Sequence, residues 1–199
     1  MQDTVAAVIL AGGGGRRLGG VDKALLPLAG RPLLAHVLAR LRPQTAKILL
    51  SANGDPARFD GFCLPVVADA LPDQGPLAGI AAAAAECQRR WPEVLWLATV
   101  PVDMPFPPLD LIDRLRAGAE GDQATVAEAG GRMHWTAAMW PVAGAAALGS
   151  KIGQEELRRL QSGLDSVGWR AVRFAEPHAF TNVNREEDLE NAARLLIDL

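Results

Sequence analysis

The 199-residue sequence contains few of the side chains that bind transition metals or form disulfides. Its two cysteines, Cys63 and Cys87, are too far apart in the chain for a CxxC motif. Its three histidines lack the HxxxH or HExxH spacing of a zinc site, and they are His36, His134 and His178. We therefore expect neither a zinc site nor a disulfide scaffold, and we interpret both cysteines as small buried apolar residues.

The sequence also lacks an excess of basic charge and any apolar run long enough to span a bilayer. Lysine and arginine total 20 against 23 aspartates and glutamates, for a net charge of −3. A nucleic-acid-binding protein would normally be basic. The apolar run at residues 5–11 is short, and Asp3 precedes it where a signal peptide carries positive charge. We predict a cytoplasmic protein that binds neither nucleic acid nor membrane.

Strand-like and helix-like segments alternate along the chain, without repeats or linkers. This order predicts one α/β domain over residues 1–199, with three layers and a mostly parallel, mixed sheet covered on both faces. The predicted strands are 4–10, 46–52, 64–69, 93–103, 122–129, 134–141 and 169–175, with Gly130–Gly131 joining two of them. The predicted helices are 31–41, 75–90, 107–118, 153–163 and a last one that Asn184 caps, with Glu187 completing a capping box.

A glycine-rich, cationic loop follows the first predicted strand, in the sequence LAGGGGRRLGGVDK at residues 10–23. In an open α/β sheet, ligands bind at the carboxyl ends of the strands. The glycines at 12–15 allow backbone N–H groups to surround an anion closely, and Arg16, Arg17 and Lys23 add positive charge. The loop therefore predicts a polyphosphate ligand.

Two familiar phosphate-binding motifs are absent from this loop. Gly12 and Gly14 begin a GxGxxG fingerprint, but Arg17 occupies the third glycine position. A P-loop requires Ser or Thr after its lysine, whereas Ala24 follows Lys23. The sequence supports neither a dinucleotide-dependent oxidoreductase nor a P-loop NTPase.

The pattern L-A-G-G-x-x-x-R-hydrophobic-G-G-x-D-K at residues 10–23 resembles the loop of the molybdenum cofactor guanylyltransferases. That family shares a superfamily with the sugar-phosphate nucleotidyltransferases. Three further motifs resemble the family's and follow in its order: Asp69 with residues 75–80, PVDMPFPP at 101–108, and FTNVN at 180–184. The resemblance covers nearly the whole chain and implies a single domain with the Rossmann-like nucleotidyltransferase fold.

The resemblance, together with the chemistry of phosphate transfer, assigns roles to individual residues. A carboxylate fixed at a strand end can hold Mg²⁺, so Asp103 is the expected metal ligand. Arg17, Lys23 and Asp103 are the expected catalytic residues, and Asn182 and Asn184 are expected to contact the acceptor. The expected nucleotide-binding residues are Leu10, Ala11, Gly12, Gly13, Gly14, Gly15, Arg17, Lys23, Ser51, Asn53, Asp69, Gly75, Pro76, Leu77 and Asp103.

Some positions depart from the family pattern or allow two interpretations. Ser51 stands where relatives commonly have asparagine, and Trp135 stands where they have proline after histidine. Trp135 and Trp140 either stack on a pterin or belong to the core. Asn184 either contacts a ligand or caps the last helix.

The resemblance implies Mg²⁺-dependent transfer of GMP from GTP to molybdopterin carrying molybdenum, with release of pyrophosphate. Asp22, next to Lys23, favours GTP over CTP by the same resemblance. The alternatives are a CTP-using relative, a sugar-1-phosphate nucleotidyltransferase and a non-catalytic nucleotide-binding relative. The resemblance also implies association with molybdoenzymes, their chaperones or earlier enzymes of the pathway.

Overall fold

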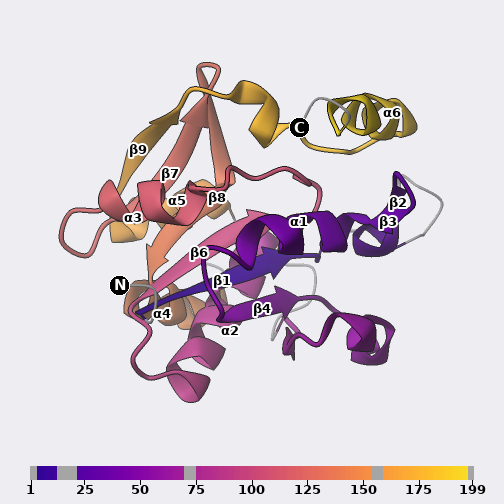
Figure 1. Ribbon diagram of the computed structural model, residues 1–199. Helices are drawn as coiled ribbons and strands as arrows, with labels where there is room; N and C mark the ends of the chain where they lie inside the picture. The colour runs from indigo at the N-terminus through magenta and orange to yellow at the C-terminus, as the bar shows by residue number, and fades with distance from the viewer. Residues whose placement is uncertain (1–3, 13–21, 70–74, 154–158, 197–199) are drawn as a thin grey trace.

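The computed structural model describes residues 4–12, 22–69, 75–153 and 159–196, and these form a seven-stranded mixed sheet. The strand order is β5-β4-β1-β6-β8-β7-β9 (Figure 1). The strands are β1 (Val5–Leu10), β4 (Ile48–Ser51), β5 (Val66–Val67), β6 (Trp96–Pro101), β7 (Ala124–Ala129), β8 (Arg132–Pro141) and β9 (Trp169–Phe174). β8 runs antiparallel to both of its neighbours, β6 and β7, and every other pairing in this sheet is parallel.

Helices cover both faces of the sheet and make three layers (Figure 1). α1 (Leu33–Leu41) and α3 (Leu111–Ala117) pack on one face. α2 (Pro76–Arg90), α4 (Val142–Gly153) and α5 (Leu160–Val167) pack on the other. Every residue of β1 is buried, because alternate side chains enter the two cores. This explains why the strand appears in the sequence as one continuous apolar run.

The described structure confirms the predicted α/β class with a mostly parallel, mixed sheet. The predicted hairpin is also confirmed: β7 pairs with β8 through Gly130 and Gly131, both at positive φ. A turn at residues 109–110 follows the prolines at 107 and 108, so the helix predicted from residue 107 begins at Leu111 instead. Arg31–Pro32, predicted as helix, pairs with Pro27–Leu28 as the short hairpin β3–β2.

Residues 153–163 were wrongly predicted as one helix, and the cap of the last helix was placed one residue too early. The prediction of 153–163 as one helix missed α4, which ends at Gly153, and α5, which begins at Leu160; residues 154–158 lie outside the described chain. The alanine- and glycine-rich sequence of α4 has too few polar residues to show an amphipathic period. α6 (Glu186–Leu195) has Arg185 at its N-cap, one residue later than predicted, and the Asp188 carboxylate accepts from the Arg185 backbone N–H at 2.9 Å.

α6 and the β2–β3 hairpin lie beyond the carboxyl ends of β1 and β6 (Figure 1). A small core of Leu28, Leu33, Phe106, Val183 and Ala192 joins them. No helix among the described residues is long and apolar enough to cross a membrane.

Candidate active site

The backbone at the carboxyl edge of the sheet continues its hydrogen-bond ladder past the strand ends. Ala11 N donates to the Ser51 carbonyl at 2.9 Å, and Val102 N donates to the Leu10 carbonyl at 3.0 Å. Val183 N donates to the Asp103 carbonyl at 2.7 Å, which ties the segment before α6 to the end of β6. These bonds bring side chains from distant parts of the sequence to one edge.

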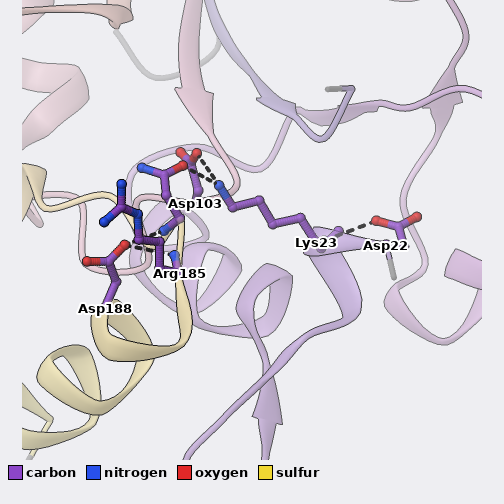
Figure 2. Close-up of polar contacts among 7 residues, drawn as sticks. Asp22, Lys23, Asp103, Arg185 and Asp188 are labelled. Atoms are coloured by element: carbon purple, nitrogen blue, oxygen red, sulfur yellow. Dashed lines mark hydrogen bonds and ion pairs between the residues drawn. The ribbon is translucent and has the colours of Figure 1, made fainter. Parts of the chain in front are cut away.

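Lys23, Asp103 and Asn184 meet at this edge, and we call them the lysine cluster. Lys23 Nζ lies 2.7 Å from Asp103 Oδ2 and donates to Asn184 Oδ1 at 2.7 Å. Figure 2 shows the Lys23 side chain extended toward Asp103, with Asp22 at the opposite end of the lysine. The Lys23 and Asp103 side chains are only 18% and 22% exposed, so water screens this ion pair incompletely.

The second oxygen of Asp103 fits a metal ion. Oδ1 is buried and has no hydrogen-bond partner among the described residues. Leaving such an oxygen unpaired costs free energy, which a hard cation such as Mg²⁺ would recover. No group of three or more His, Cys, Asp or Glu side chains suited to a metal occurs in the described ranges. Mg²⁺ at Asp103 would therefore rely on phosphate and water ligands, as it commonly does.

A second group of side chains, the Asn53–Asp69 cluster, follows β4 and β5. Asn53 Nδ2 donates to Asp69 Oδ2 at 3.0 Å, and Asp69 N donates to Asn53 Oδ1 at 2.8 Å. The buried Ser51 hydroxyl donates to Asp69 Oδ1 at 3.3 Å. A Cβ on Gly12 would lie 3.7 Å from Asp69 Oδ2, so the carboxylate is beside the start of the glycine-rich loop.

Helix α2 approaches this cluster closely at Gly79, where any larger residue would displace the Ser51 and Asp69 side chains. A Cβ there would lie 2.4 Å from Ser51 Oγ and 2.8 Å from Asp69 Oδ1. At the start of α2, Gly75 is the N-cap with φ of 73°, and among the described residues no side-chain cap is found for the first turn. Pro76 has no backbone N–H, so the candidate donors to an anion at this helix start are the backbone N–H groups of the exposed Gly75 and of Leu77, whose side chain is buried in the core.

Beyond Asn184 lies a cavity of about 580 Å³ between the β7–β8 hairpin and the segment before α6. Asn182 and Asn184 both line it, and so does Trp135, whose ring meets Trp169 edge-on with centroids 5.1 Å apart. His134 also lines the cavity, with its ring 4.7 Å from that of Phe180. Burial lowers the pKa of His134, so the neutral imidazole is favoured.

Trp140 is fully buried, which confirms the core interpretation and excludes stacking on a ligand. Asn184 is not the N-cap of α6; its side-chain oxygen accepts a hydrogen bond from Lys23 Nζ instead. The predicted residues Gly13, Gly14, Gly15, Arg16 and Arg17 lie outside the described residues.

Sequence reasoning missed Arg58 and the close contact at Gly79. Arg58 donates to the Asp22 side chain, next to Lys23, and to the Asn53 carbonyl. It therefore connects the segment that carries Lys23 with the segment that carries Asn53. Its position in the sequence carries no motif. Gly79 was visible in the GPLAGI motif, but one sequence does not show what a glycine's missing side chain would touch.

Comparison with known proteins agrees with this geometry. Residues 7–167 match the model of the MobA-like NTP transferase domain. A molybdenum cofactor guanylyltransferase from Cereibacter sphaeroides is 47% identical, with 95% of each chain covered. One from Acidiphilium cryptum is 45% identical, covering 94% of this chain and 92% of the relative. Molybdopterin-guanine dinucleotide biosynthesis protein A from Archaeoglobus fulgidus shares the fold at 21% identity, with a TM-score of 0.73 over 98% and 100% of the two chains.

The sheet order, the lysine cluster and these matches define a nucleotidyltransferase. Within that class, the chain belongs to the MobA-like NTP transferase family, together with the molybdenum cofactor guanylyltransferases. The resemblance seen in the sequence motifs is thereby confirmed.

Proposed function

We propose that the chain transfers GMP from GTP to molybdenum-loaded molybdopterin. A phosphate oxygen of the pterin attacks the α-phosphorus and forms a new P–O bond. The bond from that phosphorus to the bridging oxygen breaks, and pyrophosphate leaves with the electron pair. The observation that carries the proposal is the position of the lysine cluster, at the edge of the sheet where the segment beginning at Asp22 meets the 580 Å³ cavity through Asn184.

The Asn53–Asp69 cluster is the proposed guanine site. A guanine edge offers two N–H donors in a row, which a carboxylate such as Asp69 accepts. Cytosine presents its N3 acceptor beside its amino group, so the same carboxylate would face a lone pair and disfavour it. The Asn53 side chain donates one hydrogen bond to the Asp69 carboxylate and accepts another from the Asp69 backbone N–H, so both the side chain and the backbone of Asp69 are held before the base arrives.

The triphosphate would bind between the loop and α2. Backbone N–H groups of Leu10 to Gly15, the charge of Arg17 and Lys23, and the first turn of α2 at Gly75–Leu77 are proposed to surround it. In this arrangement Lys23 moves its ammonium from Asp103 to the phosphates. Positioning and neutralisation of charge are the main contributions of a protein to phosphate transfer.

Asp103 is the proposed Mg²⁺ ligand through its buried Oδ1. Bound there, Mg²⁺ would neutralise charge on the reacting phosphates. Asn184 accepts from Lys23, and with Asn182 it is proposed to orient the acceptor phosphate. The pterin would extend from these residues into the cavity past Trp135.

We further propose that residues 1–199 act as a single domain in the cytoplasm, where both cysteines remain reduced. Molybdoenzymes, their chaperones or earlier enzymes of the pathway are the proposed protein partners, because the product has to reach an apoenzyme. The support for these partners is membership of the family.

The test uses purified protein, Mg²⁺ and molybdenum-loaded molybdopterin with GTP, CTP, ATP or UTP in separate reactions. We expect pterin dinucleotide and pyrophosphate with GTP alone. Lys23→Met should reduce turnover on the order of 100-fold, whereas Lys151→Met, which changes an exposed lysine of α4, should leave it unchanged. Product mainly with CTP would overturn the base assignment, and turnover only with a sugar 1-phosphate would overturn the acceptor.

A further inference from the structure

Arg58 lies in the 3₁₀ helix η4 (Pro56–Phe62), which follows β4, and its guanidinium makes contacts in several directions. Nε donates to Asp22 Oδ2 at 2.7 Å, and Nη2 donates to the Asn53 carbonyl at 2.6 Å. Nη1 donates to the Asp55 carbonyl. The group also lies over the Phe59 ring, 4.3 Å from its centroid. Each nitrogen of the guanidinium therefore has a partner within the protein.

The Asp22 end of this bridge controls the start of the turn that carries Lys23. Asp22 Oδ1 accepts from Ala24 N at 3.0 Å and caps the 3₁₀ helix η3 (Lys23–Leu25). Its other oxygen is taken by Arg58. Both oxygens of Asp22 are thus engaged within the protein, on the side away from Asp103 (Figure 2).

The Asn53 end of the bridge controls the proposed base site. Arg58 holds the Asn53 backbone, while the Asn53 side chain holds Asp69 through the two bonds described above. Asn53 itself is exposed and is followed by Gly54, at φ of 86°, so the local chain alone does little to fix it. The guanidinium supplies the missing constraint.

A single exposed ion pair contributes little to stability. Arg58 differs because its planar fork meets a carboxylate and two carbonyls at fixed angles while stacking on Phe59, and the Arg58 and Asp22 side chains are 28% and 23% exposed. A lysine has one compact ammonium and cannot reach these partners together. The contacts therefore depend on arginine specifically.

We propose that Arg58 is a positioning residue for the nucleotide site. It sets the distance between the base-binding Asn53–Asp69 cluster and the phosphate-binding Lys23 turn, and so tightens GTP binding and guanine selectivity without touching the nucleotide. This inference rests on the proposed function, because it takes GTP as the nucleotide.

The test compares Arg58→Met, Arg58→Lys and the control Arg42→Met. Methionine keeps the apolar stem over Phe59 but removes every donated bond. Arg42 donates to the Phe62 carbonyl at 3.1 Å and so supports the other end of η4, without contacting Asp22 or Asn53. The readouts are kcat and KM for GTP and CTP, and the affinity of each nucleotide measured by calorimetry without the acceptor.

Arg58→Met should lower the ratio of GTP to CTP affinity roughly tenfold, mainly through a raised KM for GTP. Arg58→Lys should restore only part of that ratio, and Arg42→Met should keep it within about twofold. Asp22→Asn weakens the same bridge with little change of shape and should lower the ratio of GTP to CTP affinity as well. This variant tests the proposal if Arg58→Met does not fold.

An unchanged ratio in Arg58→Met, or an equal fall in Arg42→Met, would overturn the positioning role. Full recovery in Arg58→Lys would overturn the requirement for the guanidinium fork. Because the calorimetric ratio needs no pterin, a wrong acceptor in the proposed function leaves this test intact. A wild-type protein that prefers CTP would refute the base assignment separately.

Discussion

Replacing Gly79 with alanine should damage the nucleotide site while leaving the fold nearly as stable. The added Cβ would lie 2.4 Å from Ser51 Oγ and 2.8 Å from Asp69 Oδ1, both closer than real Cβ contacts. Both atoms are side-chain ends, so the clash is relieved by turning Ser51 and Asp69 rather than by moving the backbone. That movement takes Asp69 away from the orientation in which it is proposed to accept from guanine.

The magnitude follows from what is displaced. Losing a charge-assisted contact to the base costs about 1.5–3 kcal/mol, or on the order of 10- to 100-fold in kcat/KM for GTP. In the opposite direction, alanine gains about 1 kcal/mol over glycine in a helix interior. The free energy of unfolding should therefore change by less than about 1 kcal/mol, because this gain offsets the strain of the displaced side chains.

The assay measures KM for GTP and the urea midpoint of unfolding on the same preparation. Gly149→Ala is the matched control: it is a helix glycine in α4 whose added Cβ would meet only Ala81 Cβ, at 3.9 Å. It should raise stability by up to about 1 kcal/mol and leave KM unchanged. Adding Ser51→Ala to Gly79→Ala removes the nearer clash and should recover part of the activity. A Gly79→Ala protein with the wild-type KM would refute the reasoning.

Two further perturbations test other parts of the site. Asp103→Asn should reduce GTP turnover at least about 100-fold across a Mg²⁺ series, measured by pyrophosphate release; wild-type turnover at saturating Mg²⁺ would contradict the metal assignment. Burial lowers the pKa of His134 below its ordinary 6.5, so the unfolded chain binds the proton at higher pH than the folded chain does. The contribution of His134 to stability should be greatest above about pH 6.5, fall as the pH drops from there toward the lower folded pKa, and level off below it; His134→Gln should flatten this part of the urea-midpoint profile between about pH 7.5 and pH 5, and an identical profile in the variant would contradict it.

The sequence predicted the buried strands well because parallel strands covered on both faces are continuous apolar runs. β1 and β6 are examples, and the polar residues that follow these strands were correctly expected at the carboxyl edge of the sheet. The position of β8 between β6 and β7 could not be predicted from the sequence, because strand order depends on packing between distant segments. α4 was missed for a different reason: alanine and glycine pack closely on α2 without producing an amphipathic pattern.

In the site as well, the sequence predicted features that depend on neighbouring residues but not contacts between distant segments. Lys23, Asp103 and Asn184 were each found in a motif, but their meeting was not, since Lys23 and Asn184 are 161 positions apart. No sequence motif indicated Arg58, because its proposed role depends on hydrogen bonds to Asp22, Asn53 and Asp55, which only the fold brings together around it. The motifs identified the residues that are proposed to contact the ligand, whereas the residues that support them could be found only from the structure.

The lysine cluster also links the binding of metal and nucleotide. Lys23 already neutralises Asp103 at 2.7 Å, so a cation approaching Asp103 alone must compete with an ammonium. Lys23 can leave only when another anion takes its charge, and the triphosphate is that anion under the proposed function. Asn184 remains as a partner for the ammonium during the exchange, because it accepts at 2.7 Å from a different segment. Under the proposed function, nucleotide binding should therefore free the Asp103 carboxylate at the same time as it brings the phosphates that Mg²⁺ needs as ligands, and we expect the two binding events to depend on each other.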